Sequence, residues 1–507
     1  MYITQTLHQA LAVRPNAIAT VYRGRETTVA TSYDRIARFA SALQSLGVQS
    51  DDVVGILALN SDKYHEYLYA VPWSNGIVNP INIRWSVQEV VYSLIDSNCR
   101  VVAVDDSFIA VAQEVKKLLP HVTLIYIGED ECPQDMHDYE TLIRSSDRLE
   151  DARRGGDRLL GVFYTGGTTG HPKGVLLTHD NLMISALSLM AMTDMVEDRG
   201  RVLHVAPLFH LADLSMWCMG NFANATHVFS PSFTPEETLK SIQNDGITDI
   251  LLVPVMLQMI VDLPRREEFA TDALRHILYG ASPISEALLN TVREVFPVTR
   301  LTQVYGMTEL APAATVLTPD EHCDPNLRRS AGRPALHTEV RIVSADGHES
   351  PPGVVGEIVV RGDNVMVGYL GNDEATESAI GTGWMHTGDV GYIDTGGYLY
   401  VVDRIKDMII TGGENVYSSE VENALAQHGA VEACAVVGLP DEKWGERVHA
   451  VVVVRGNVPV TDDELIQHCR RLIGGYKVPR SISFVDSMPV SAAGKILKRE
   501  LREQCLS

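Results

Sequence analysis

The sequence predicts an α/β protein with two parts. The first is a large N-terminal domain of helix-covered, mainly parallel sheets that ends in a barrel-like β segment, and the second is a small α+β C-terminal domain. Runs of β-branched residues alternate with helical patterns over the first two thirds of the 507 residues. Short strands bounded by Gly, Pro and Asp begin near residue 330. A last unit of about 100 residues, a common domain size, starts near residue 405.

The opening elements set the strand–helix alternation. Residues 32–47 begin at Ser32, repeat apolar residues at helical spacing and end at Gly47, which predicts a helix. The run DVVGILALN at 52–60 predicts a strand. The same alternation continues through RVVAVDD, RVLHVAP and HILYGAS. Parallel strands joined by helices are the expected result.

The last third predicts two further units. EVRIVSADG, GEIVVRG and GYIDTGGYLYVVD predict an antiparallel or barrel-like part over about 330–404. Strand and helix patterns then alternate through MIITGG, SSEVENALAQHG, VEACAVVG, RVHAVVVV, DDELIQHCRRLIG and SISFVD. We therefore place the domain boundary between residues 404 and 405. The join contains no Ser/Gly linker, so the two domains, 1–404 and 405–507, should stay within reach of each other.

Composition excludes several classes of protein. The net charge of -23 disfavours a nucleic-acid partner, because such a surface repels phosphate backbones. Seven scattered cysteines without a CxxC pair indicate reduced thiols in a cytoplasmic protein. The first residues lack the pattern of a signal peptide. The longest apolar stretch, 250–261, is too short to span a bilayer and contains Pro254, so no integral membrane segment is expected.

The stretch FYTGGTTGHPKGVLLTH at 163–179 has the composition of a phosphate-binding loop. Its glycines permit close backbone approach to a ligand, its threonines add hydroxyl donors, and Lys173 adds a mobile charge. It is not a Walker A loop, because VLLT predicts a strand after the lysine where a Walker A loop enters a helix. A simple tight turn is the alternative for two glycines, but this stretch is denser. The residues concerned are Thr165, Gly166, Gly167, Thr168, Thr169, Gly170 and Lys173.

Five motifs in order give the chain a resemblance to a known family. They are YTGGTTGHPKGV, VYGMTE (304–309), GWMHTGDVGY (383–392), VVDRIKDMIITGGENVYSSEVE (401–422) and SAAGKILKREL (491–501). This set resembles the adenylate-forming enzymes: acyl- and aryl-CoA ligases, firefly-type luciferases and peptide-synthetase adenylation domains. The resemblance extends over nearly the whole chain. It implies that a carboxylate is joined to the α-phosphate of ATP as acyl-AMP, pyrophosphate leaves, and a thiol then displaces AMP.

The resemblance also implies catalytic roles. Two anions meet in the first step, so positive charge must face the α-phosphate, and Lys495 matches the family's catalytic lysine. Glu309 matches the ligand of Mg²⁺, a cation that prefers oxygen ligands and phosphates. Thr308 would touch the α-phosphate. His210 would lie near the acyl carboxylate and the exit of the pantetheine tunnel, although a lone histidine is more often structural.

The nucleotide is expected to contact several other motifs. The loop from Thr165 to Lys173 would hold the β- and γ-phosphates, the part that leaves. Tyr305 would stack on adenine, with space for the flat base beside the small residues that follow the strand HILYG. Asp389 would accept from both ribose hydroxyls, with help from Arg404. The remaining residues of the nucleotide site are Gly280, Ala281, Ser282, Gly306 and Met307.

Thiol transfer is expected to use the same site after the C-terminal domain rotates. Lys406 matches the family's hinge, so this small domain should be mobile. Gly412, Gly413 and Glu414 would then flank the pantetheine arm of CoA, since glycines leave room for a narrow chain. The family most often has Ser where this chain has Gly166. Gly166→Ser should therefore be tolerated and should lower the apparent KM for ATP.

The substrate is expected to be an apolar monocarboxylic acid, either a medium- or long-chain fatty acid or an aryl acid. The stretches matched to the acyl pocket are apolar and lack a Lys or Arg for a second carboxylate: 210–217, 253–256, 279–281 and 307–312. Because no carrier motif is appended, CoA is the favoured acceptor. The pantetheine of a carrier protein remains an alternative acceptor. A luciferase-like oxidase and a non-catalytic adenylate-binding protein remain alternative functions for the chain. The sequence leaves open whether the chain forms a homodimer.

Overall fold

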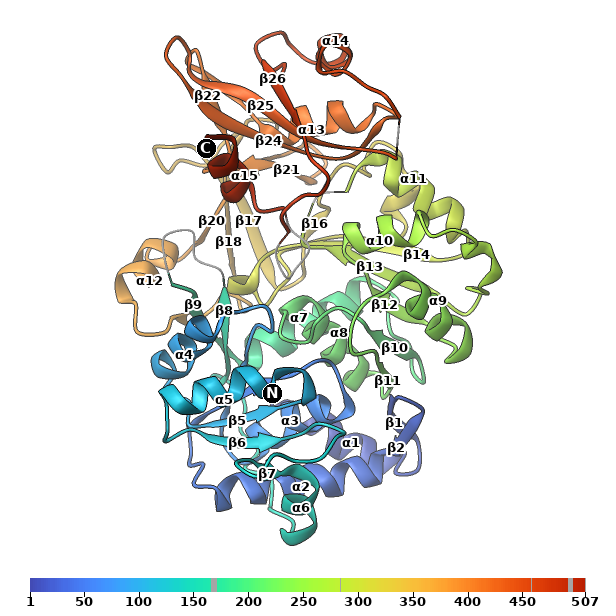
Figure 1. Ribbon diagram of the computed structural model, residues 1–507, viewed down its shortest axis with the longest axis vertical. Helices are drawn as coiled ribbons and strands as arrows, with labels where there is room; N and C mark the ends of the chain where they lie inside the picture. The colour runs from blue at the N-terminus through green and yellow to red at the C-terminus, as the bar shows by residue number, and fades with distance from the viewer. Residues whose placement is uncertain (166–170, 283, 457, 491–495, 507) are drawn as a thin grey trace.

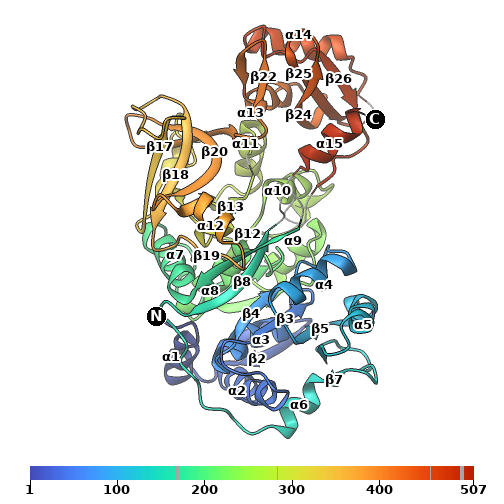
Figure 2. The ribbon, with the colours of Figure 1, turned by 90° about the vertical axis from the view of Figure 1, so that its left-hand side faces the viewer.

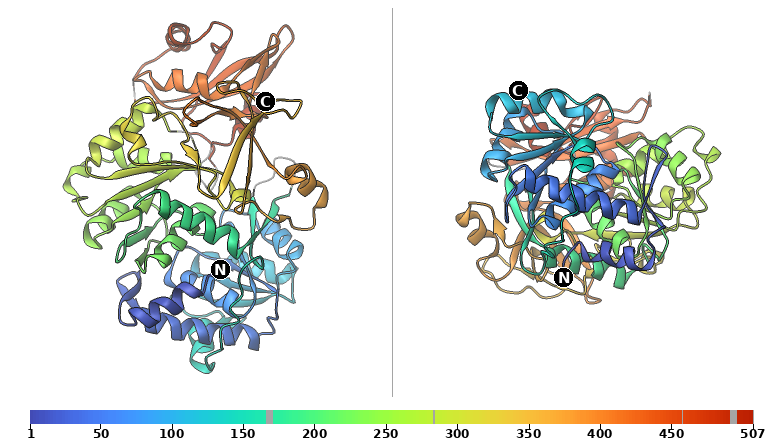
Figure 3. Two further views of the ribbon diagram at one scale, coloured as in Figure 1. Left: turned by 180° about the vertical axis from the view of Figure 1, so that it is seen from behind. Right: turned by 90° about the horizontal axis from the view of Figure 1, so that it is seen from below.

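Four sheets organise the computed structural model, which describes residues 1–165, 171–282, 284–456, 458–490 and 496–506. Three of the sheets build the large N-terminal part, and the fourth forms the small C-terminal part, coloured orange to red at one end of the molecule (Figures 1 and 2). Figure 3 shows from behind that the first helices, in blue, lie at the opposite end. The predicted α/β architecture is confirmed.

The eight-stranded sheet has the order β19-β9-β8-β4-β3-β5-β6-β7. The strands from β8 to β7 pair in parallel, whereas β9 pairs antiparallel with both β8 and β19. The strands are β3 (Val53–Leu57), β4 (Ile77–Pro80), β5 (Val101–Val104), β6 (Thr123–Tyr126), β7 (His137–Asp138), β8 (Leu159–Thr165), β9 (Lys173–Thr178) and β19 (Gly368–Tyr369). The helices along this part are α1 (Gln5–Val13), α2 (Val29–Ser45), α3 (Asp62–Trp73), α4 (Val87–Asp96), η1 (Asp106–Phe108), α5 (Ile109–Leu118) and α6 (Tyr139–Ser145).

The nine-stranded sheet has the order β16-β15-β14-β13-β12-β10-β11-β1-β2, with a parallel centre and antiparallel edges. Its strands are β1 (Ile18–Tyr22), β2 (Arg25–Thr28), β10 (Arg201–His204), β11 (Thr226–Phe229), β12 (Asp249–Leu251), β13 (His276–Gly280), β14 (Arg300–Tyr305), β15 (Thr315–Leu317) and β16 (Arg333–Pro334). Its helices are α7 (His179–Met192), α8 (Leu211–Phe222), α9 (Pro235–Asn244), α10 (Pro254–Val261), η2 (Arg266–Glu268), α11 (Glu286–Val295), η3 (Thr308–Leu310) and η4 (Glu321–Cys323).

The antiparallel segment expected near residue 330 is a four-stranded sheet of order β17-β18-β20-β21. Its elements are β17 (Thr338–Val343), β18 (Gly356–Gly362), α12 (Asp373–Ile380), β20 (Met385–Ile393) and β21 (Leu399–Arg404). Strand β21 ends at Arg404, and the next strand along the chain belongs to another sheet. The boundary between residues 404 and 405 stays a prediction.

The C-terminal sheet is mixed: β26 pairs in parallel with β25, and all the other strand pairs of this sheet are antiparallel. Its elements are β22 (Ile409–Thr411), β23 (Glu414–Val416), α13 (Ser418–Ala426), β24 (Val431–Asp441), β25 (Gly445–Val454), α14 (Asp462–Leu472), β26 (Ser481–Phe484) and α15 (Lys498–Leu506). The sequence pattern predicts all of these except β23 and α15, which are short and polar.

The largest hydrophobic core lies between the two big sheets. Helices α2, α3, α7 and α8 fill it, and Trp73 and Trp217 are each 1% exposed there. A second core covers the other face of β12 and β13 under α9, α10 and α11. Among the described residues, no helix has the length and apolarity that crossing a membrane requires.

The start of α2 differs from the prediction. The helix begins at Val29 rather than Ser32, because the Thr28 side chain accepts from the Thr31 N–H and caps the helix three residues earlier. Ser32 is 1% exposed inside the helix. An apolar residue at the first helical position hid this start from the sequence pattern.

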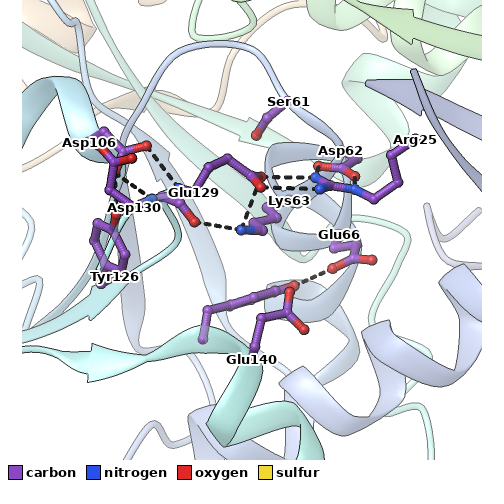
Figure 4. A network of polar contacts seen from close by, with 12 residues as sticks. Arg25, Ser61, Asp62, Lys63, Glu66, Asp106, Tyr126, Glu129, Asp130 and Glu140 are labelled. Carbon is purple, nitrogen blue, oxygen red and sulfur yellow. Dashed lines mark hydrogen bonds and ion pairs between the residues drawn. The ribbon is translucent and has the colours of Figure 1, made fainter. Parts of the chain in front are cut away.

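A charged network secures the N-terminal strands to the eight-stranded sheet (Figure 4). Arg25 of β2 pairs with Asp62 at the start of α3 and with Glu129 after β6, each at 2.9 Å. Lys63, only 6% exposed, donates to the Gly128 carbonyl at 2.7 Å. Hydrogen bonding from Arg25 lowers the pKa of Glu129. The network joins segments that are far apart in the chain. Its cations, Arg25 and Lys63, are paired with acidic and carbonyl groups of the protein itself.

Candidate nucleotide site and interdomain contacts

The candidate site forms where the three N-terminal sheets converge. Strands β13 and β14 are parallel neighbours, so Gly280 and Tyr305 emerge at the same edge. The β8–β9 hairpin contributes the predicted phosphate loop, and β20 and β21 contribute Asp389 and Arg404. Ligands of α/β sheets bind at this kind of edge, beyond the carboxyl ends of the strands.

The phosphate loop connects two antiparallel strands, as predicted. Thr165 and Lys173 are paired across the hairpin at the ends of β8 and β9. The Lys173 ammonium lies 4.7 Å from the centre of the Tyr369 ring. The predictions for Gly166, Gly167, Thr168, Thr169 and Gly170 fall outside the described residues and stay predictions.

Glu309, the predicted Mg²⁺ ligand, is held by Tyr369. The Tyr369 hydroxyl donates to Glu309 Oε1 at 2.9 Å, and Glu309 is 6% exposed. Burial raises the pKa of Tyr369, and the carboxylate of Glu309 raises it further. Tyr369 therefore stays a neutral hydrogen-bond donor. Because it also contacts Lys173, it links β9 to the turn η3.

A second hydrogen bond joins the nine-stranded and four-stranded sheets. The Tyr305 hydroxyl donates to Asp389 Oδ2 at 2.7 Å, and Arg404 Nε lies 3.3 Å from Asp389 Oδ1. Burial and the neighbouring Asp389 raise the pKa of Tyr305 well above its usual value. Each Asp389 oxygen keeps a lone pair for another donor. Arg404 thus lies beside Asp389, whereas its assistance in ribose binding and the ribose and adenine contacts stay predictions.

Two glycines at this edge are required by close backbone packing. A Cβ on Gly280 would lie 2.2 Å from the Val304 carbonyl oxygen, and one on Gly306 would lie 1.9 Å from that of Pro312. Ala281 follows with φ at +65°, which is strained for a residue with a side chain. The glycines therefore serve β14 and the turn after it, in addition to any space they leave for a base.

The other predicted residues near this edge are partly buried or exposed. Ser282 and Met307 are partly buried beside Gly280 and Gly306, and Thr308 begins η3. His210 occupies the N-cap position of α8, and its ring lies 4.1 Å from that of Phe209. The catalytic roles of Thr308 and His210 stay predictions.

Two residues of the predicted acyl pocket point elsewhere. Trp217 donates to His65 Nδ1 at 2.9 Å inside the large core. Tyr279 belongs to the second core and contacts Gln303 and His322 through its hydroxyl. Both side chains are 1% exposed. Whole stretches were assigned to the pocket, but neighbouring residues of helix α8 and of strand β13 face different sides of their elements.

The predicted catalytic Lys495 lies outside the described residues. Lys498, three positions later, begins α15 and donates to Ser418 Oγ at 2.5 Å. It also pairs with Glu422 at 2.7 Å. Burial alone would lower the pKa of Lys498, but Glu422 and Asp403 raise it overall. Lys498 therefore fixes the chain just beyond the predicted catalytic residue.

Ser418 also makes a contact across the predicted domain boundary. Its backbone N–H and its hydroxyl both donate to Asp403 Oδ2 of β21, the second at 2.8 Å. The Ser419 hydroxyl donates to the Val402 carbonyl. Asp403 thus caps the N-terminus of α13, where the helix dipole favours a negative charge. We call Asp403, Ser418, Lys498 and Glu422 the interdomain cluster.

The predicted hinge lies between these contacts. Lys406 is in a turn in which Asp407 and Met408 N–H groups both donate to the Arg404 carbonyl at 3.0 Å. Gly412 and Gly413 have φ values of +63° and +84°, which favour glycine, and Glu414 begins β23. Both Figure 1 and Figure 2 show β22 in the upper part of the C-terminal domain, away from β8 and β13. The predicted CoA-tunnel residues are therefore not at the nucleotide site in this structure.

Trp444 is a neighbour of Gly412 that sequence reasoning missed. Gly412 N–H donates to the Trp444 carbonyl at 2.8 Å. Lys443 Nζ and Arg480 Cζ lie 4.8 Å and 4.7 Å from the Trp444 ring. Two cationic side chains thus lie against one aromatic ring beside these glycines. Tyr369 and Asp403 were missed as well, because their partners are 60 and 15 residues away.

The β8–β9 hairpin, the buried Glu309 carboxylate and the Asp389–Arg404 pair meet at this edge, as a nucleotide-using enzyme would require. The family described as "AMP-binding enzyme" matches residues 7–370, and "AMP-binding enzyme C-terminal domain" matches residues 420–495. The chain belongs to this family of AMP-forming acid–thiol ligases.

Similar proteins span the whole chain. A feruloyl-CoA synthase from Amycolatopsis sp is 38% identical over 97% of this chain and 96% of its own. The fatty acid–[acyl-carrier-protein] ligase ScoC from Streptomyces coeruleorubidus is 35% identical over 97% and 94%. The structure of o-succinylbenzoate CoA synthetase from Bacillus subtilis with its acyl-adenylate intermediate matches with a TM-score of 0.86 at 31% identity, covering 98% and 97%.

Proposed function

We propose that this protein joins an apolar monocarboxylic acid, aryl or fatty, to coenzyme A through an acyl-adenylate. The observation that carries the proposal is the site at the three-sheet junction, where Tyr369 contacts both Lys173 and Glu309 and Tyr305 contacts the Asp389–Arg404 pair. These groups match the needs of ATP: cations for phosphates, a carboxylate for a divalent ion, and a carboxylate for a diol.

The residues fit a Mg²⁺ ion. Glu309 Oε1 accepts from Tyr369, so the other carboxylate oxygen retains its lone pairs for a cation. Mg²⁺ is usually bound by one or two carboxylates together with substrate phosphates. Bound there, Mg²⁺ would neutralise phosphate charge, while Lys173 orients the departing pyrophosphate and Lys495 faces the α-phosphate.

Thiol transfer is proposed to use a second orientation of the C-terminal domain, reached by rotation at Lys406. The support is that β22, which directly precedes Gly412 and Gly413, lies away from β8 and β13 in both ribbon views. Their neighbours Lys443, Trp444 and Arg480 offer charge and a ring to CoA. The interdomain cluster holds the orientation described here. It must open before the glycines can approach the adenylate.

A panel of carboxylic acids with ATP, followed by AMP release, tests the proposal. We expect turnover with cinnamate-like or fatty acids and free CoA. Dicarboxylates should be poor substrates, because the described residues of the matched pocket stretches include no Lys or Arg. Turnover with an acyl-carrier protein but none with CoA would favour the ScoC-like alternative. No turnover with any apolar acid would contradict the proposal.

A further inference from the structure

Tyr369 lies between the two groups that are proposed to meet the phosphates of ATP. Its hydroxyl is 2.9 Å from Glu309 Oε1, and Lys173 Nζ is 4.7 Å from the centre of its ring. Tyr369 and Glu309 are 9% and 6% exposed. One buried side chain thus contacts an anion through its edge and a cation through its face.

The backbone around Tyr369 holds the ring in place. Strand β19 pairs with β9, with Tyr369 opposite Val175, two residues beyond Lys173. The Tyr369 N–H donates to Thr376 Oγ1 of α12 at 2.9 Å. The Met366 N–H donates to the Glu309 carbonyl at 2.9 Å, so the segment before β19 is also tied to η3. These contacts fix the backbone position from which the phenol projects toward Glu309 and Lys173.

The two contacts act on different groups. A hydroxyl that donates to a carboxylate fixes the rotation of that carboxylate, and such supporting partners strongly affect the affinity of a site for metal. The face of an aromatic ring attracts an ammonium group and limits where a flexible lysine rests. The hydroxyl should therefore serve Glu309, and the ring should serve Lys173.

We propose that Tyr369 is a positioning residue for adenylation, which orients Glu309 toward the metal–phosphate complex and holds Lys173 beside the phosphate loop. This inference rests on the proposed function of the same site. It separates the roles of the hydroxyl and the ring, which a purely structural tyrosine would not do.

The test compares Tyr369→Phe, which removes only the hydroxyl, with Tyr369→Leu, which also removes the ring. Mn²⁺ is titrated into enzyme saturated with α,β-methylene-ATP and followed by electron paramagnetic resonance. We expect Tyr369→Phe to weaken Mn²⁺ affinity about tenfold and to leave affinity for the nucleotide without metal unchanged. Tyr369→Leu should weaken both.

Tyr398→Phe is a matched control. The Tyr398 hydroxyl donates to Glu321 Oε1 at 3.0 Å, and Arg333 Cζ lies 4.3 Å from its ring, so it repeats the arrangement outside the site. We expect this variant to change neither affinity. A double-mutant cycle of Tyr369→Leu with Lys173→Met gives a second measurement: the nucleotide effect of Tyr369→Leu should vanish when Lys173 is absent.

Unchanged Mn²⁺ affinity in Tyr369→Phe would overturn the inference, as would additive effects in the cycle. The inference would also be overturned if Tyr369→Phe and Tyr369→Leu lost affinity for Mn²⁺ and for the metal-free nucleotide to the same extent. The variant Glu309→Gln distinguishes a failure of the Tyr369 inference from a failure of the proposed metal and nucleotide site. If that variant loses Mn²⁺ affinity while Tyr369→Phe does not, the proposed site stands and the role of Tyr369 is wrong.

Discussion

Ser418→Ala should shift the enzyme from adenylation toward thiol transfer. The substitution removes the hydroxyl that donates to Asp403 at 2.8 Å and accepts from Lys498 at 2.5 Å. Asp403 is 9% exposed and the Lys498 side chain is 20% exposed, so solvent replaces these partners only in part. A hydrogen bond to a charged group contributes about 1.5–3 kcal/mol.

Only the bond from Ser418 to Asp403 crosses the predicted domain boundary, so its contribution applies to the orientation in which Asp403 and Ser418 are in contact. A loss of about 1.4 kcal/mol changes the ratio of two orientations tenfold. We therefore expect the rate of acyl transfer from synthetic acyl-AMP to CoA, divided by the rate of ATP–pyrophosphate exchange, to rise at least about tenfold. The ratio is the informative quantity because expression and the active fraction cancel.

Glu420→Gln is the matched control for this experiment. Glu420 lies on α13, the helix that Ser418 begins, and pairs with Lys477 at 2.7 Å. Both Glu420 and Lys477 belong to the predicted C-terminal domain, so this pair does not cross the boundary. Its ratio of half-reaction rates should stay at the wild-type value. If Ser418→Ala changes both half-reactions equally, or if the control shifts the ratio as strongly, the interdomain cluster does not select an orientation.

Three other perturbations follow from the structure. Lys406→Pro should spare adenylate formation and cripple thiol transfer, because it stiffens the hinge; equal losses in the separately measured half-reactions would refute this. Gly306→Ala should lower the free energy of unfolding by more than about 1 kcal/mol, because its Cβ would meet the Pro312 oxygen at 1.9 Å, and an unchanged denaturation midpoint would count against that packing. Burial lowers the pKa of His65 to about 3. As the pH falls, His65 therefore takes up a proton in the unfolded chain before it does so in the folded protein. The contribution of neutral His65 to the free energy of unfolding is complete above pH 6.5 and falls by up to about 1.4 kcal/mol per pH unit toward pH 3. Urea titrations at several pH values should therefore show a weaker pH dependence of stability in His65→Gln than in the wild type.

The sequence predicted the parts of the fold that local patterns determine. Alternating apolar runs identified the parallel sheets, and the strand after Lys173 correctly placed the phosphate loop within a hairpin. The start of α2 was missed because the cap from Thr28 precedes an apolar helical residue. The short strand β23 and the polar helix α15 lack the periodicity that a sequence reading requires.

The candidate site was predictable where a motif carries the residue and unpredictable where a tertiary contact does. Asp389 and Arg404 meet, as expected from their motifs. No spacing rule connects Tyr369 to Glu309 or Asp403 to Ser418, since each pair comes from different sheets or domains. Tyr279 was assigned to the pocket with its whole stretch, but alternation along β13 turns it into the second core.

Oxygen tracing tests the central claim most directly. The acid is supplied with ¹⁸O in its carboxylate, together with ATP and CoA, and the nucleotide product is examined by mass spectrometry. An acyl-adenylate requires one carboxylate oxygen to bond to the α-phosphorus and to leave with AMP when the thiol attacks the acyl carbon. We expect AMP that carries one ¹⁸O for each acyl-CoA formed. AMP without label, or label in inorganic phosphate, would contradict an acyl-adenylate intermediate.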